Sequence, residues 1–213
     1  MMGYTEVNIE TWARKNTYNW YKNYDDPYFN FTVNVDVTRL YDFIKRTSSS
    51  FFLGSLHVCL TAANRVENFR MRTIEDRLVL YDVIHGGSTI LYDDGSFGFA
   101  YYDFHQDLKT FVENGMNEIE ERKRTKSFVP NEKGDHSNLI YFSSIPWFTF
   151  TSTKHANHHT INTSIPRISF GKYFKQEDKL LMPLSIEANH AIMDGYHIGL
   201  FLEEFSKINN SIG

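Results

Sequence analysis

The sequence of 213 residues predicts an α/β (α+β) fold, in which helices pack on one large, mixed and mainly antiparallel sheet. Short alternating or apolar runs, which are typical of strands, outnumber the segments with helical periodicity. Strands and helices are also interspersed along the chain instead of forming separate blocks. A chain of this length can bury about 70% of its unfolded surface in one core. We therefore expect a single domain over residues 1–213.

The first part of the chain alternates between helical and extended patterns. Residues 9–21 carry large side chains at helical spacing, and the Asp-Asp-Pro sequence at 25–27 ends that helix. Residues 28–37 alternate between polar and apolar side chains, which predicts a half-buried strand. Two helices should follow, the first capped by Thr38 and the second mostly apolar: residues 40–46 and 51–66.

The middle of the chain contains short strands and one long helix. Residues 89–92 and 97–102 flank an Asp-Asp-Gly-Ser turn, which predicts a hairpin. Residues 107–126 form an amphipathic pattern with a highly charged end, which is typical of a solvated helix. Two short strands should precede the hairpin: residues 69–72 and 78–81.

The last part of the chain contains the remaining strands. Residues 138–142 should form a strand that kinks at Pro146 and continues over residues 148–151. A polar loop over residues 152–165 separates it from the next strand. Two strands and a closing helix complete the prediction: residues 167–174, 179–187 and 198–208.

Composition narrows the class of protein. The net charge is −4, from 22 basic and 26 acidic residues, and favours neither nucleic acid nor a membrane surface. Cys59 is the single cysteine, so it cannot form an intramolecular disulfide, and we expect it in the core of a protein from a reducing compartment. The N-terminus has no secretion signal, and no window approaches the ~18 apolar residues of a membrane span. These features predict a cytoplasmic protein.

The most informative stretch is residues 189–197, between the last strand and the last helix. His190 and Asp194 lie at this junction, where Gly195 relaxes the backbone. A hydrogen-bonded core histidine beside a helix-capping aspartate is the simple interpretation. However, small and apolar residues surround the pair, and buried polar groups without partners cost ~1–3 kcal/mol each. The pair therefore needs specific partners and is a candidate site.

Four stretches of the chain belong together by their order and spacing, from about residue 9 to residue 205. They are Trp12-x-Arg14-Lys15, Ser143-Ser144-Ile145-Pro146-Trp147, Gly171-Lys172-Tyr173-Phe174 and His190-x-x-x-Asp194-Gly195-Tyr196-His197. Together they resemble the chloramphenicol acetyltransferases. The resemblance implies the coenzyme A-dependent acyltransferase fold of that family. It also implies a homotrimer with active sites between subunits, acetyl-CoA as co-substrate, and no metal.

The resemblance assigns a role to each matching residue. His190 falls on the general base, and Ser143 on the serine that supports the tetrahedral intermediate. Asp194 falls on a structural aspartate that pairs with an arginine, here Arg14. The coenzyme side would include Lys172, Tyr173 and Ser169, the last at a position whose hydroxyl helps to hold a water. The acceptor wall would include Trp20, Tyr21, Phe31, Thr153, His155 and Arg167.

The chemistry of these residue types agrees with the roles. A neutral imidazole can take a hydroxyl proton at cellular pH, and such general-base catalysis contributes roughly 10²–10⁴-fold. A hydroxyl donor for the developing oxyanion is worth roughly 10²–10³-fold. An Arg14–Asp194 pair would clamp the His190 loop to the first helix. Breaking such a pair, where it is buried, costs about 3–5 kcal/mol.

The sequence also departs from the family pattern. Asn189 replaces a common histidine, and Met193 a common cysteine. His155, Asn157 and Arg167 place polar groups on an acceptor wall that is usually apolar. The acceptor is therefore either chloramphenicol, with antibiotic resistance as the result, or a more polar hydroxyl compound.

Other functions are possible from the residues alone. Ser143 could be a hydrolase nucleophile, but it lacks the Gly-x-Ser-x-Gly elbow. A trimeric binding module that has lost its acceptor is a third class. Metal sites could use either of two residue sets, neither with an evident second shell: His155, His158 and His159, or His190, Asp194 and His197.

Overall fold

A computed structural model describes residues 3–126, 137–156 and 164–213. In this part of the chain five α-helices and ten strands are interspersed, as predicted. The helices are α1 (Lys15–Tyr21), α2 (Thr38–Thr47), α3 (Phe51–Arg65), α4 (Leu108–Thr125) and α5 (Gly195–Ser211), with a 3₁₀ turn at Glu67–Arg70. The strands are β1 (Tyr4–Glu6), β2 (Tyr28–Asp36), β3 (Met71–Ile74), β4 (Arg77–Tyr81), β5 (His85–Leu91), β6 (Phe97–Tyr102), β7 (Leu139–Ile145), β8 (Arg167–Gly171), β9 (Phe174–Gln176) and β10 (Lys179–Asn189).

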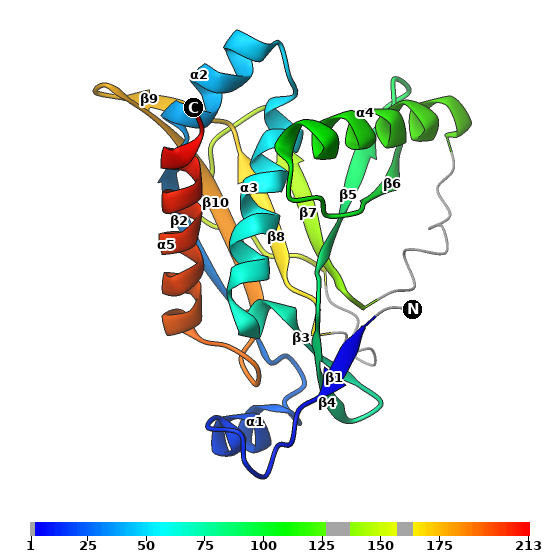
Figure 1. Ribbon diagram of the computed structural model, residues 1–213, viewed down its shortest axis with the longest axis vertical. Helices are drawn as coiled ribbons and strands as arrows, with labels where there is room; N and C mark the ends of the chain where they lie inside the picture. The colour runs from blue at the N-terminus through cyan, green and yellow to red at the C-terminus, as the bar shows by residue number, and fades with distance from the viewer. Residues whose placement is uncertain (1–2, 127–136, 157–163) are drawn as a thin grey trace.

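The strands form one large and one small sheet (Figure 1). The large sheet has seven strands in the order β2-β10-β8-β7-β5-β6, and β9 pairs with β10. Its β5–β7 and β7–β8 pairs are parallel and its other pairs are antiparallel, which confirms a mixed, mainly antiparallel sheet. The predicted hairpin is the antiparallel β5–β6 pair. The small sheet has three strands in the order β1-β4-β3.

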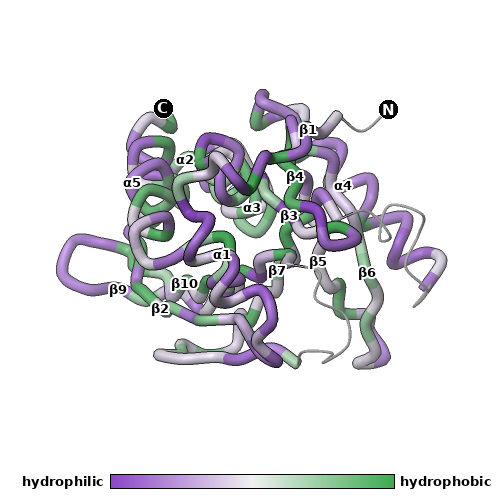
Figure 2. The backbone as a smooth tube through the Cα atoms, turned by 90° about the horizontal axis from the view of Figure 1, so that it is seen from below, coloured by the Kyte–Doolittle hydropathy of each residue, from purple (hydrophilic) through white to green (hydrophobic). Residues whose placement is uncertain are grey.

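The core lies between the large sheet and helices α3 and α5, which cover one of its faces (Figure 1). Because side chains alternate along a strand, every second residue of β10 points to this face. Leu184 and Ile186 do so, and both are fully buried. Helix α3 is buried along most of its length and contains Cys59, whose burial raises the pKa of the thiol well above its ordinary value. Figure 2 shows hydrophobic residues along α3 and hydrophilic ones on the outer helix α4.

The opposite face of the sheet carries a row of hydroxyl groups. Ser185 of β10 pairs in register with Ser169 of β8, which pairs with Ser143 of β7. Thr32 of β2 pairs with Ser185 on the other side. Directly paired residues share a face, so these four hydroxyls form a line across four strands, which we call the hydroxyl row. Their face is the one without helices.

The prediction of a helix over residues 9–21 is wrong at its start, because α1 begins only at Lys15. Residues 9–14 form turns, closed by hydrogen bonds from Trp12 N–H to the Ile9 carbonyl and from Lys15 N–H to the Trp12 carbonyl. Arg14, just before the helix, has a non-helical backbone and a side chain held by Asp194. A distant ion pair therefore anchors the end of a segment whose periodicity alone favours a longer helix.

Strand boundaries also differ from the prediction. Residues 148–151 are not a strand, because the chain leaves the sheet after Pro146. The predicted strand over residues 167–174 is two strands, β8 and β9, with a break at residues 172 and 173. Residues 67–70 form a 3₁₀ turn, and β3 starts only at Met71. The three-residue strand β1 is too short to leave a periodic signal.

Arg72 of β3 is fully buried and connects the small sheet to the large one. Among the described residues, its guanidinium donates hydrogen bonds to four main-chain carbonyls and to no carboxylate. Burial lowers the pKa of Arg72 to about 10. The acceptors are Ser137 (2.8 Å), Phe69 (2.9 Å), Met71 (2.6 Å) and Leu139 (2.5 Å).

Candidate active site

His190 directly follows β10, in a turn that its neighbours hold in place. The main-chain N–H of His190 donates to the Pro27 carbonyl at 2.8 Å. The Asn189 side chain accepts from Ala191 N–H at 2.9 Å, and the Asn189 carbonyl accepts from Met193 N–H at 3.1 Å. Asn189, at the position where a histidine is common, therefore serves the backbone of the turn.

The hydrogen bonding of the His190 ring determines which nitrogen can act as a base. Nδ1 lies 3.2 Å from the Met193 carbonyl oxygen. A carbonyl only accepts, so Nδ1 must carry the hydrogen and donate it. In the neutral ring Nε2 is then the nitrogen with a free lone pair. This tautomer is the one that a general base requires.

Aromatic rings fix the plane of the imidazole. Tyr21 stacks on His190 with ring centroids 4.3 Å apart and planes 13° apart. Phe29 contacts the same ring at 5.0 Å, and Phe31 packs edge-on against Phe29. Trp20 is 68% exposed. Of the residues predicted for the acceptor wall, Tyr21 thus contacts the His190 ring directly. Phe31 contacts Phe29, which in turn contacts the His190 ring.

Asp194 binds both the first helix and its own helix. Oδ2 accepts from Arg14 Nη1 at 2.5 Å, while Oδ1 accepts from Tyr196 N–H at 3.0 Å and lies 2.9 Å from His197 Nδ1. Asp194 caps α5, and His197 completes a capping box. Burial alone would raise the pKa of Asp194, but Arg14 and then His197 outweigh it and hold that pKa below its ordinary value.

We expect Arg14→Met to destabilise the protein by about 1–3 kcal/mol at neutral pH, less than for a fully buried pair because Asp194 is partly exposed. A group with a lowered folded-state pKa stabilises the protein above its unfolded pKa. That contribution disappears as pH falls through the lowered pKa. The difference between wild type and variant should therefore shrink below about pH 4.

Urea unfolding at pH 7 and pH 3 measures this difference. Lys15→Met removes a neighbouring but exposed pair with Glu10, and should change little at either pH. A loss in Arg14→Met that is equal at both pH values would show that the Asp194 carboxylate is not what Arg14 stabilises.

Ser143 is not beside His190 within one chain. Ser143 pairs with Ser169, which pairs with Ser185 of β10, and Ser185 is five residues before His190. With a rise of about 3.3 Å per residue and strands about 4.8 Å apart, Ser143 and His190 are separated by roughly 15–20 Å. Ser143 is half-buried inside strand β7, not at a strand-to-helix turn, which disfavours a hydrolase nucleophile.

A second group of polar residues surrounds Ser169, and we call it the polar cluster. Ser169 Oγ lies 3.0 Å from His155 Nε2. Glu187 Oε2 accepts from His155 N–H at 3.3 Å, and Glu187 Oε1 accepts from Arg167 Nη1 at 2.6 Å. Burial would raise the pKa of Glu187, but hydrogen bonds from His155 and Arg167 hold it below its ordinary value. Arg167 also lies over the ring of Tyr28.

Sequence reasoning missed Glu187, although a signal was present. Glu187 ends a run that predicts a largely buried strand, and it is only 2% exposed. A buried carboxylate requires a partner. Arg167 is that partner, because it pairs with Glu187 in the β8–β10 register. Thr153, also predicted for this wall, is half-buried.

The structure brings together two of the three residues predicted for the coenzyme side. A cavity of about 310 Å³ opens between the start of α3 and the ends of β7 and β8. Ser144 and Pro146 line one part of it, and Lys172 and Tyr173 another. Ser169 is with His155 in the polar cluster on the other face. The remaining residues that line the cavity are Phe51, Phe52, Ser55, Phe170, Gly171 and Met182.

Among the described residues, no three His, Cys, Asp or Glu side chains are close enough together to hold a metal ion. Of the proposed ligands, His197 and Asp194 bond to each other, and His190 Nδ1 faces a carbonyl. His158 and His159 lie outside the described residues. No helix in the described ranges has the length and apolar character to cross a membrane.

Comparison with known proteins places these features in context. The family model described as "Chloramphenicol acetyltransferase" matches residues 2–206. A chloramphenicol acetyltransferase of Escherichia coli is 29% identical over 96% of this chain and 93% of its own length. One of Clostridium perfringens is 28% identical over 97% and 95%.

Solved structures agree with the sequence matches. A solved chloramphenicol acetyltransferase superimposes with a TM-score of 0.86, at 27% identity over 96% of this chain and 99% of its own. A probable dihydrolipoamide acetyltransferase of Listeria monocytogenes has a TM-score of 0.68 at 15% identity, over 98% of this chain and 94% of its own, and shares the fold. The large sheet with its helices is therefore an acyltransferase architecture.

Proposed function

The chain belongs to the chloramphenicol acetyltransferase family and is an acyltransferase, and we propose that it moves an acetyl group from acetyl-CoA to a hydroxyl group of chloramphenicol. One observation carries this proposal: the Nδ1 hydrogen of His190 is committed to the Met193 carbonyl, which leaves Nε2 as a base. Acetylation of the drug would give antibiotic resistance. We assign this activity to one domain over residues 1–213.

In the proposed reaction, His190 Nε2 takes the proton of the acceptor hydroxyl, and the hydroxyl oxygen attacks the thioester carbonyl carbon. The Ser143 hydroxyl donates a hydrogen bond to the oxyanion that develops there. The carbon–sulfur bond then breaks, and the imidazolium returns the proton to the departing thiolate. Asp194 and Arg14 touch neither substrate; they fix the turn that carries His190.

The arrangement of His190 and Ser143 supports a site shared between subunits. The two residues are too far apart within one chain to act on the same atoms, yet the mechanism needs both. A cyclic trimer would bring His190 of one subunit to Ser143 of the next. The exposed aromatic side chains Trp20, Phe31 and Trp147 supply apolar surface for such contacts.

We expect two inactive variants to complement each other when refolded together. His190→Ala chains keep Ser143, and Ser143→Ala chains keep His190. In a randomly mixed trimer, roughly a quarter of the shared sites would hold both native residues. Thiol release should rise to about that fraction of the wild-type rate.

Each variant refolded alone is the control and should remain nearly inactive. Light scattering on the same samples reports the trimer. No gain on mixing, or a stable and active monomer, would contradict the shared site.

Coenzyme binding is proposed at the cavity lined by Lys172 and Tyr173. Ser144, which lines the cavity, directly follows Ser143 in β7, but the two side chains lie on opposite faces of the sheet. A thioester entering from the Tyr173 side would therefore pass the end of β7 near Pro146 to reach Ser143. Aromatic rings beside Tyr173 suit an adenine base, and the ammonium of Lys172 suits a phosphate. The residues present therefore fit acetyl-CoA as a co-substrate.

Chloramphenicol as acceptor is supported by the charged pair of the polar cluster. Arg167 and Glu187 neutralise each other, so this pair does not require a polar acceptor as its partner. His155 bonds to Ser169 through Nε2, while its buried Nδ1 lies 3.7 Å from Glu187 Oε2 and has no hydrogen-bond partner among the described residues. Replacing Arg167 alone would leave the Glu187 carboxylate buried and unpaired, so such a variant would report on stability more than on specificity.

The direct test is thiol release from acetyl-CoA with and without chloramphenicol. Release that depends on chloramphenicol supports the proposal, whereas its absence refutes the acceptor. Release only with a more polar alcohol would favour the alternative acceptor class. We also propose a cytoplasmic location, which is supported by the single, fully buried Cys59.

A further inference from the structure

The coenzyme cavity ends in an aromatic rim, formed by Tyr41, Phe51 and Tyr173. Ring centroids are 5.3 Å apart between Tyr41 and Tyr173, 5.3 Å between Phe51 and Tyr173, and 6.0 Å between Tyr41 and Phe51. Phe51 and Tyr173 also line the cavity, and Tyr41 of α2 packs against both of them. A linear molecule that extends from the Ser144 side would therefore leave the cavity across this rim.

Coenzyme A is too large for the cavity to hold entirely. The cavity of about 310 Å³ is at the lower end of the range of small-molecule sites, ~300–1,000 Å³. Acetyl-CoA carries a nucleotide in addition to its pantetheine arm. If the thioester lies near Ser143, the nucleotide end must project beyond the rim. That end carries a diphosphate and, outermost, a 3′-phosphate, so it is strongly anionic.

Lys45 lies just beyond the rim. Its Nζ is 4.8 Å from the centroid of the Tyr41 ring. The interaction of the ammonium with the Tyr41 side chain raises the pKa of Lys45 above its ordinary value. The Tyr41 hydroxyl also interacts with that of Tyr173. Lys45 is thus a permanent cation held against the aromatic group that borders the cavity.

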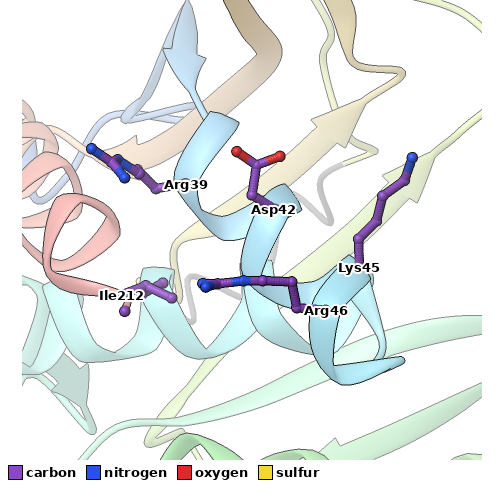
Figure 3. Close-up of a pocket in the computed structure, with 6 residues that line it drawn as sticks. Arg39, Asp42, Lys45, Arg46 and Ile212 are labelled. Carbon is purple, nitrogen blue, oxygen red and sulfur yellow. The ribbon is translucent and has the colours of Figure 1, made fainter.

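Two other cations of α2, Arg39 and Arg46, are placed differently. They line a separate hollow of about 520 Å³, together with Asp42, Lys45 and the end of the chain. Figure 3 shows Lys45 extending away from Arg46, while Arg46 points toward Ile212. The basic residues of α2 therefore do not converge on one point, and Lys45 is the one in contact with the rim.

We propose that Tyr41 and Lys45 form the outer part of the coenzyme site, and that the Lys45 ammonium binds the 3′-phosphate of coenzyme A. Lys172 lines the cavity itself and would meet the inner diphosphate, which leaves the outermost phosphate for Lys45. An ammonium is a suitable partner for a phosphate. The inference rests on the proposed acetyl transfer and adds a specificity determinant to it.

The test compares acetyl-CoA with acetyl-dephospho-CoA, which lacks only the 3′-phosphate. In Lys45→Met we expect the KM for acetyl-CoA to rise about tenfold, the size of one charge-assisted hydrogen bond. The KM for acetyl-dephospho-CoA should stay unchanged, as should kcat with either donor. Arg46→Met is the matched control on the same helix and should change neither KM.

The outcomes separate this inference from the proposed function. If Lys45→Met changes both KM values equally, or neither, the enzyme remains an acetyltransferase and the assignment of Lys45 is wrong. If the wild type releases no thiol with chloramphenicol, the proposed function fails. Titration calorimetry with coenzyme A and dephospho-coenzyme A then decides the inference alone. Equal affinity of the wild type for the two compounds would overturn it, and a preference that Lys45→Met abolishes would sustain it.

Discussion

His190→Ala should lower acetyl transfer by at least about 10²-fold and by as much as about 10⁴-fold, because it removes the general base. The fold should survive, since the turn around residue 190 is held by main-chain bonds and by Asn189. Steady-state thiol release at saturating acetyl-CoA measures the loss.

Added imidazole provides a sharper control for the role of His190. The ring stacks on Tyr21 and contacts Phe29, so its removal leaves a flat gap between aromatic side chains. Imidazole in the buffer should occupy this gap and restore part of the activity of His190→Ala. His190→Gln keeps a polar side chain without a comparable base and should not be rescued. Near-normal turnover in either variant would remove His190 from the mechanism.

Arg72→Met should destabilise the protein by at least about 4 kcal/mol, a large share of the ~5–15 kcal/mol that holds a typical domain together. Four main-chain carbonyls lose their donor, and each buried acceptor left without a partner costs about 1–3 kcal/mol. Because Met71 belongs to the small sheet and Leu139 to the large one, the loss should loosen the junction between the two sheets. Urea unfolding of the intact protein measures the free energy.

Two variants control for the location and the charge of Arg72. Arg77→Met removes an exposed cation from the same small sheet and should change stability by less than about 1 kcal/mol. Arg72→Lys keeps the charge but cannot reproduce the planar fork, so its loss should be intermediate. If the urea concentration at the unfolding midpoint of Arg72→Met equalled that of the wild type, the four carbonyls would have found other donors.

Local pattern was sufficient for much of the fold. The alternation over residues 28–37 predicts β2 almost to its ends, because Phe29, Val33 and Val35 pack against the core and polar residues alternate with them, although Phe31 on the same face is exposed. The turn at residues 93–96 predicts the β5–β6 hairpin. The predictions that failed lie where tertiary contacts override the pattern. Residues 9–14 are one case, where Arg14 is bound to Asp194, and residues 148–151 are the other, where the chain leaves the sheet.

The sequence by itself determined the chemistry available here: a histidine and an aspartate at a strand-to-helix junction, and a serine at the end of an earlier strand. Only the tertiary structure decided their partners, because hydrophobic periodicity acts over a few residues whereas these contacts join distant segments. Arg14 and Asp194 meet across 180 positions of the chain. Glu187 meets Arg167 because strand order places β10 beside β8. That same order separates Ser143 from His190 within one chain, since the two residues are two strands apart and also differ by five residues along the strand direction.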